Sequence, residues 1–105
     1  MMGDVIPVFD VLAEPNRRRI LELLGDRERP VSDLVGGLEI SQPAVSKHLR
    51  ILRDAGLVEV RSVAQRRLYR VRSEPLKEMF EWLQPYRHLW ETGLDKLERH
   101  LDAMP

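Results

Sequence analysis

The chain has 105 residues, which is enough for one small domain with a thin hydrophobic core. It carries 17 basic and 17 acidic side chains, so its formal net charge is zero. It contains no cysteine, which excludes disulfides, thiolate metal sites and thiol redox chemistry. There is no apolar run of membrane-spanning length and no signal-peptide pattern at the N-terminus, so we expect a cytoplasmic protein with no membrane contact.

The charges are unevenly placed along the chain. Residues 41–70 carry seven basic and two acidic side chains, whereas residues 1–40 and 71–105 each carry more acidic than basic ones. A neutral chain with a basic middle indicates a localised contact with a polyanion, and not general adhesion to one.

The N-terminal part is predicted to form two short helices. The spacing of apolar side chains indicates an amphipathic helix over residues 5–13, frayed before Pro7. A second helix begins at Pro15 and runs to about Leu24, where Gly25 ends it.

Three arginines, Arg17, Arg18 and Arg19, open the second helix, where their charges oppose its macrodipole. Two interpretations stay open. The arginines form a solvated face paired with Asp10, Glu14 or Glu22, or one or two of them contact phosphate.

A third helix is predicted after a polar loop over residues 26–30. Val31 is expected in a short strand, and Ser32 is expected to cap a helix over residues 33–37. A short turn then delivers the chain to Ser41.

A fourth helix is predicted over about residues 42–55, with a clear start and end. Ser41 suits its N-cap, Pro43 its first turn, and Gly56 the position that ends a helix. One side is apolar and carries Val45, Leu49 and Leu52. The opposite side carries Gln42, Ser46, Arg50 and Arg53, with Pro43 and Lys47 beside them. Amides, hydroxyls and cations are the groups that hydrogen-bond base edges and neutralise phosphates.

The third and fourth helices together indicate a helix-turn-helix whose second helix has a basic outer face. Taken alone, a basic helix of this kind is more often an ordinary amphipathic helix whose polar face is solvated. His48 borders the apolar stripe, and we expect it to be a structural histidine bonded to a neighbouring group.

The period of the pattern changes after Gly56. Residues 57–61 and 67–71 are β-type runs, which predict an antiparallel hairpin, or wing, over about residues 57–72. Arg66 and Arg67 fall near its tip, where cations meet phosphates or a minor groove. Because the tip lacks glycine, we expect a longer, mobile loop over residues 62–66.

The C-terminal part is predicted to form a long helix over about residues 75–102, broken near Gln84 by Pro85. Its apolar stripe has too little of its own domain to pack against, so a partner copy is expected to cover it. The stripe consists of Leu76, Leu83, Trp90 and Leu97, with Phe80, Leu94 and Leu101 in the adjacent row. The residues predicted to form the homodimer are Val5, Val8, Phe9, Leu12, Leu83, Trp90, Leu94, Leu97 and Leu101.

Three segments together resemble the ArsR/SmtB-type winged helix-turn-helix repressors of bacteria: residues 12–24, residues 41–58 and residues 66–69. The tail over residues 82–91 is similar to the metal-independent branch of that family. The resemblance implies a mainly α fold with a β-hairpin wing, and a homodimer joined through its first and last helices. It makes residues 42–55 the recognition helix and residues 57–72 the wing. The expected DNA contacts are Ser41, Gln42, Pro43, Ser46, Lys47, Arg50, Arg66, Arg67 and Tyr69.

The sequence departs from the metal-sensing pattern of that family. Where arsenic and cadmium sensors have a pair of cysteines, this chain has Pro30 and Ser32. Where zinc sensors have an Asp and a last ligand, it has Tyr86 and Ala103. His88 and His100 are offset around one helix, and a zinc site needs three or four converging ligands. We therefore expect no metal and no cofactor.

The leading hypothesis is a sequence-specific bacterial transcriptional regulator, a repressor of its own or a neighbouring operon that binds an imperfect palindrome in double-stranded DNA. The alternatives are a winged-helix protein-interaction module that has lost DNA binding and a metal-responsive sensor. An enzyme is not expected, because the sequence has no nucleophile–base pair, glycine-rich phosphate loop or metal cluster.

Overall fold

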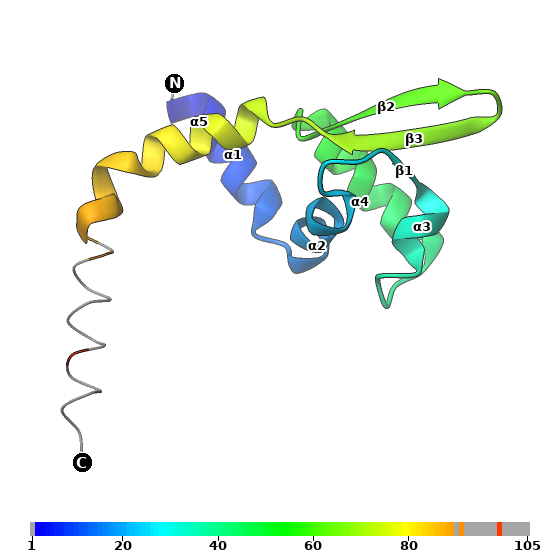
Figure 1. Ribbon diagram of the computed structural model, residues 1–105, viewed down its shortest axis with the longest axis horizontal. Coiled ribbons are helices and arrows are strands. Elements are labelled where there is room, and N and C mark those ends of the chain that lie inside the picture. The colour runs from blue at the N-terminus through cyan, green and yellow to red at the C-terminus, as the bar shows by residue number, and fades with distance from the viewer. Residues whose placement is uncertain (1, 90, 92–98, 100–105) are drawn as a thin grey trace, which may run out of the picture.

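The computed structural model describes residues 2–89, together with residues 91 and 99. The elements, in chain order, are α1 (Met2–Leu12), α2 (Pro15–Leu24), β1 (Arg29–Pro30), α3 (Val31–Val35), α4 (Gln42–Asp54), β2 (Val58–Val63), β3 (Arg66–Val71), α5 (Glu74–Leu83) and the 3₁₀ turn η1 (Gln84–Tyr86). The β2–β3 hairpin projects from one end of the molecule, while α1 and α5 lie side by side at the other (Figure 1). The predicted fold class, mainly α with a β-hairpin wing, is confirmed.

Helix α1 extends on both sides of Pro7, so the predicted fraying before this residue is wrong. Pro7 lies in the second turn of the helix, where it removes a single backbone hydrogen bond near the start. Helix α2 begins and ends as expected. Glu14 caps its start, since the Glu14 Oε2 accepts from the Arg17 backbone N–H at 3.0 Å, and Gly25 follows its last residue with φ of 57°.

The three arginines of α2 are engaged within the chain. Two of them donate to the last carbonyls of α1, where a cation also meets the negative end of the helix dipole. The hydrogen bonds are from Arg17 Nε to the Val11 carbonyl (2.6 Å), from Arg18 Nη1 to the Leu12 carbonyl (2.7 Å), and from Arg19 Nη1 to Glu22 (3.1 Å). Arg17 and Arg18 therefore fasten α1 to α2, and the predicted acid pairing is found for Arg19.

Helix α3 starts two residues earlier than predicted. Val31 is its first residue and not a strand residue, and the N-cap position belongs to Pro30, with no side-chain capping bond. The strand β1 consists of Arg29 and Pro30 instead, and it pairs with β3. Proline fixes its own φ and so suits both the edge strand and the position before a helix.

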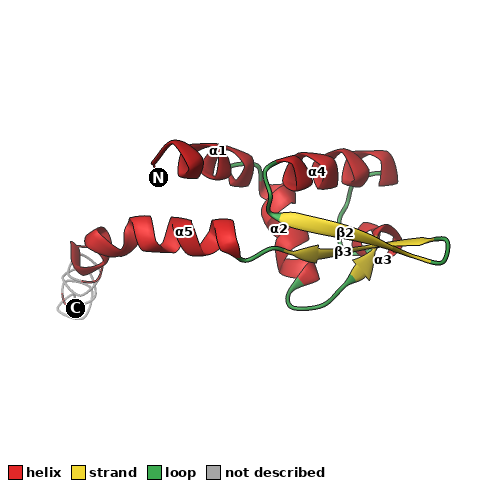
Figure 2. Cartoon of the chain, turned by 90° about the horizontal axis from the view of Figure 1, so that it is seen from above, coloured by secondary structure: helices red, strands yellow, loops and turns green. Residues whose placement is uncertain are grey.

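The three strands form an antiparallel sheet in the order β1-β3-β2. Tyr69 in the central strand pairs with Arg29 on one side and with Val60 on the other. One face of this sheet packs on the helices, and the hydrophobic core lies between them (Figure 2). The core side chains are Val8, Ile20, Leu24, Leu34, Leu38, Val45, Leu49, Leu52, Leu57, Val58 and Tyr69.

The tip of the hairpin is tighter than expected. Val63 pairs with Arg66, so only Ala64 and Gln65 lie in the turn, and the predicted longer loop is wrong. Ala64 supplies the positive φ that such a turn requires, at 57°, in place of glycine. A residue with a Cβ atom is sterically strained at a positive φ.

After α5, the helix is interrupted by η1 at Pro85, which confirms the predicted break near Gln84. The Trp82 ring packs edge-on against Phe9 of α1, with ring centroids 5.6 Å apart. The predicted dimer residues Trp90, Leu94, Leu97 and Leu101 lie outside the described residues, as does the side chain of Val5. In the part of the chain that is described, no helix has both the length and the apolar character to cross a lipid bilayer.

Candidate nucleic-acid interface

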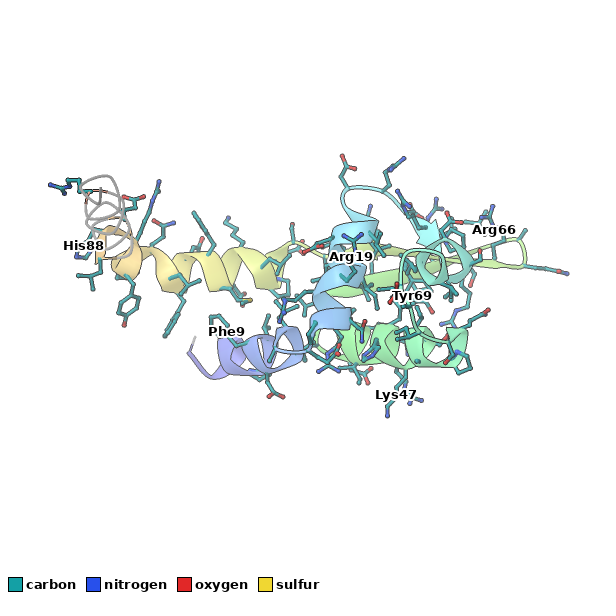
Figure 3. The ribbon with its side chains drawn as sticks, turned by 90° about the horizontal axis from the view of Figure 1, so that it is seen from below. Phe9, Arg19, Lys47, Arg66, Tyr69 and His88 are labelled. Carbon is teal, nitrogen blue, oxygen red and sulfur yellow. The ribbon has the colours of Figure 1, made fainter. Side chains whose placement is uncertain are left out.

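Helix α4 presents two chemically distinct sides. The Ser41 Oγ accepts from the Ala44 backbone N–H at 3.3 Å, which confirms Ser41 as the N-cap. The apolar side is fully buried, with Val45, Leu49 and Leu52 each 0% exposed. The exposed side carries Gln42, Ser46, Lys47, Arg50 and Arg53. Lys47 points away from the body of the protein (Figure 3).

The β2–β3 hairpin also has two distinct faces, because side chains alternate along a strand. Arg67 and Tyr69 share the face that packs toward α4, and their partners there are Ser62 and Val60. Arg66 belongs to the opposite face, although it is adjacent to Arg67 in the sequence. The two arginines that the sequence grouped at the wing tip are therefore directed to different sides.

A cleft of about 570 Å³ lies between the exposed side of α4 and the inner face of the wing. It is lined by Val31, Pro43, Ser46, Lys47, Leu49, Arg50, Arg53, Arg67 and Tyr69. Four of these nine side chains are cations, and no carboxylate is among them. The arrangement favours a polyanion that touches helix and wing at once.

The aromatic residue of the cleft holds one of its cations. The Arg67 guanidinium carbon lies 5.9 Å from the centroid of the Tyr69 ring, within the range of a cation–π interaction. Tyr69 itself is only 7% exposed and belongs to the hydrophobic core. Little of its side chain is left to contact DNA directly.

On the outer face of the hairpin, two of the three arginines are paired with glutamates. Arg61 Nε donates to Glu28 Oε2 at 2.6 Å, and Arg70 Nε donates to Glu59 Oε1 on the neighbouring strand. The hydrogen bond to Glu28 and its negative charge raise the pKa of Arg61 above its ordinary value. Two of the seven cations in residues 41–70 are thus paired on the side away from the cleft.

The cleft brings together most of the predicted contacts: Pro43, Ser46, Lys47, Arg50, Arg67 and Tyr69. Ser41 and Gln42 lie beside it at the exposed start of α4, while Arg66 lies on the outer face near the tip. The predicted set left out Arg53, which lines the cleft. Its position three residues after Arg50 and seven after Ser46, on the same side of the helix, is the signal that identifies it.

His48 lies on another side of α4, close to the start of α2. Its Nδ1 is 3.9 Å from the Glu14 Oε2, and its side chain is 18% exposed. The expectation of a structural histidine fits this half-buried position. The expected hydrogen bond is not seen, since among the described residues the Nδ1 has no partner at bonding distance.

Within residues 2–89 and the two further described positions, no three side chains of the metal-ligating types come together. His88 follows η1 and lies at the end of the molecule away from the cleft (Figure 3). The other histidine considered as a ligand, His100, is outside the described residues.

A recognition helix, a preceding short helix and a basic-tipped hairpin define a winged helix-turn-helix DNA-binding protein. Residues 14–60 match the family described as "Bacterial regulatory protein, arsR family". The transcriptional activator HlyU of Vibrio cholerae is 40% identical over 78 residues, which cover 74% of this chain and 72% of HlyU. The transcriptional repressor SdpR of Bacillus subtilis is 30% identical over 76 residues, 72% of this chain and 84% of SdpR.

Solved structures agree with the sequence relatives. An ArsR-like transcriptional regulator from Rhodococcus sp. RHA1 has a TM-score of 0.72 and 28% identity, over 98% of this chain and 97% of that one. Reduced HlyU from Vibrio cholerae has a TM-score of 0.67 and 37% identity, over 82% and 88% of the two chains. The chain belongs to the ArsR family of DNA-binding transcriptional regulators, which confirms the predicted family and the prediction that it is not an enzyme.

Proposed function

We propose that this regulator is a homodimeric repressor that binds an imperfect palindromic operator with α4 in the major groove. The observation that carries the proposal is the cleft with four cations and no carboxylate between α4 and the wing. Repression is favoured because SdpR and the SmtB homolog of Synechocystis sp. are both named transcriptional repressors, although HlyU is named an activator. Because the chromosome is its target, we place the protein in the cytoplasm.

The exposed groups of α4 support two roles along the helix, base reading near its start and phosphate binding further along. Gln42 and Ser46 lie one turn apart near its start, the end of a recognition helix that meets base edges. A glutamine can bond adenine bidentately, and a serine can donate or accept. Lys47, Arg50 and Arg67 then hold phosphates, which position the protein without reading sequence.

The proposed dimer surface is made of the exposed large apolar side chains of α5 and the segment that follows it. It consists of Phe80 (60% exposed), Leu83 (44%), Tyr86 (53%) and Leu89 (62%). Four exposed large apolar side chains within ten residues of a small domain favour a partner. Phe9 and Leu12, also predicted for the dimer, already pack within the chain, and Val8 is only 4% exposed.

A two-fold dimer places two copies of α4 on one side of the duplex. Successive major grooves lie roughly 34 Å apart, so each copy meets one half of a palindrome. The operator half-sites are therefore expected about one helical turn apart, measured between their centres.

The DNA proposal is tested by selecting duplexes retained by the purified protein from genomic fragments, including its own upstream region, at physiological salt. We expect one or a few fragments that share an imperfect palindrome. The selected fragment is then placed before a reporter, which the protein should repress. Retention of no fragment, or of all fragments equally, would contradict sequence-specific binding, and activation would contradict repression.

The dimer proposal is tested by sedimentation at micromolar concentration, where we expect about twice the chain mass. Phe80→Glu should weaken the dimer, because it places a charge in an apolar contact. Lys77→Glu is the matched control, since it adds the same acid at an exposed polar position of the same helix. A monomeric wild type, or equal effects of both changes, would contradict the proposed surface.

A further inference from the structure

Tyr69 stands out because it belongs to two environments at once. It is a core residue at 7% exposure, and it also lines the cleft. Its strand is the central one of the sheet, paired on both sides, so its backbone is fixed by β1 and β2 together. Figure 3 shows Tyr69 between the hairpin and α4.

Arg67, in contrast to the buried Tyr69, has few constraints on its side chain. It is exposed, long and two residues from the hairpin turn, and a free arginine loses much rotamer freedom when it binds a phosphate. The Tyr69 ring lies on the same sheet face, with its centroid 5.9 Å from the guanidinium carbon. Contact with the fixed ring of Tyr69 therefore restricts the Arg67 guanidinium before DNA binds.

We propose that Tyr69 is a positioning residue for DNA binding: its ring holds the Arg67 guanidinium in the cleft beside α4, so that wing and recognition helix meet the duplex as one preformed surface. The inference rests on the proposed DNA-binding function and differs from the sequence prediction that Tyr69 contacts DNA itself. It assigns the effect to the ring, and not to the hydroxyl.

The test is a double-mutant cycle of Tyr69→Leu and Arg67→Ala, measured on the duplex selected by the wild type. Tyr69→Leu should weaken binding by about 2- to 5-fold per wing, from the usual strength of an exposed cation–π contact. In the Arg67→Ala background the same change should have no effect, because Tyr69 acts through Arg67. A loss of equal size in both backgrounds would show a merely structural role and overturn the proposal.

Tyr69→Phe separates the ring from the hydroxyl. It keeps the ring, so we expect binding within about twofold of the wild type. A loss as large as that of Tyr69→Leu would assign the effect to a hydroxyl contact with DNA and contradict the proposal. Wild-type binding is the reference throughout: if the wild type retains no duplex, the proposed function fails, whereas wild-type binding without coupling defeats only the inference.

A measurement on the unmodified protein covers the case in which Tyr69→Leu does not fold. The ring current of Tyr69 should shift the side-chain protons of Arg67 upfield in the NMR spectrum of the free protein. Arg66 is the matched control, because it is adjacent in sequence and lies on the opposite sheet face. Equal shifts for the two arginines would contradict a positioned guanidinium.

Discussion

The two faces of the β2–β3 hairpin differ in how many arginines they carry and in what those arginines can do. The outer face carries Arg61, Arg66 and Arg70, and the inner face carries Arg67. On the outer face, Arg61 and Arg70 are each paired with a glutamate. On the inner face, Arg67 lies over Tyr69 in a cleft with no carboxylate in its lining. The charge available to DNA therefore depends on which face an arginine occupies and on whether an acid pairs with it there, and not on the net charge of the segment.

The largest effect is expected from reversing a charge on the inner face. In the proposed dimer–DNA complex, Arg67→Glu would replace a phosphate contact with repulsion in both wings, and charge-assisted hydrogen bonds are the strong ones. We expect affinity for any duplex to fall on the order of 1,000-fold. The measurement is binding to the selected duplex and to a scrambled one in the same buffer.

Arg61→Glu is the matched control on the outer face of the same hairpin. It makes the same change of charge, but its arginine is bonded to Glu28 and points away from the cleft. We expect a far smaller loss, set by long-range repulsion that salt screens. Equal losses for the two reversals would remove the distinction between the faces.

The next effect separates base reading from phosphate contact. Gln42→Ala should cost about 1–3 kcal/mol on the operator and little on scrambled DNA, because only a base contact carries sequence information. Arg67→Ala should weaken both duplexes and lower the salt slope by roughly one per wing. If Gln42→Ala lowers the affinity for both duplexes equally, the assignment of base reading to the start of α4 is wrong.

Much of this architecture was predictable from local sequence, because the signals are local. Ser41 and Gly25 mark helix ends through their own backbone preferences, and the apolar spacing of Val45 and Leu49 fixes the buried side of α4. Contacts between distant segments were not predictable. The pairing of Arg61 with Glu28 spans 33 residues and crosses β3, and no periodicity reports it.

The turn of the wing was also not predictable from local sequence. The absence of glycine at the hairpin tip predicted a long loop, yet Ala64 accepts a positive φ and the turn closes over two residues. The long run of cross-strand pairs from Val58 to Val63 stabilises the hairpin enough to hold that strain. That closure moves Arg66 and Arg67 to opposite faces, which the sequence alone had grouped.

A smaller effect is expected from opening an outer-face pair. Glu59→Gln removes the carboxylate that Arg70 bonds, and both side chains are substantially exposed. We expect a loss of stability below about 1 kcal/mol in urea unfolding, since exposed ion pairs contribute little. Operator affinity should stay within about twofold, because the freed cation faces away from the cleft; a clear gain in affinity would place Arg70 on DNA.

The smallest effect is expected from Ala64→Gly at the wing turn. Glycine adopts the positive φ without steric strain, but it also raises the entropy of the unfolded chain. We expect a net stabilisation of a few tenths of a kcal/mol, roughly 1–4 °C in thermal unfolding. Gln65→Gly is the control, since Gln65 does not have a positive φ, and it should be neutral or destabilising.

In the proposed complex, the cleft between α4 and the inner face of the wing is the surface that contacts DNA. The most direct test is an NMR titration of the wild-type protein with the selected duplex, following backbone amides and arginine side chains together. We expect the largest chemical-shift changes at Ser46, Arg50 and Arg67, and almost none at Glu59 and Arg61. Shifts concentrated on the outer face, or absent from α4, would contradict it.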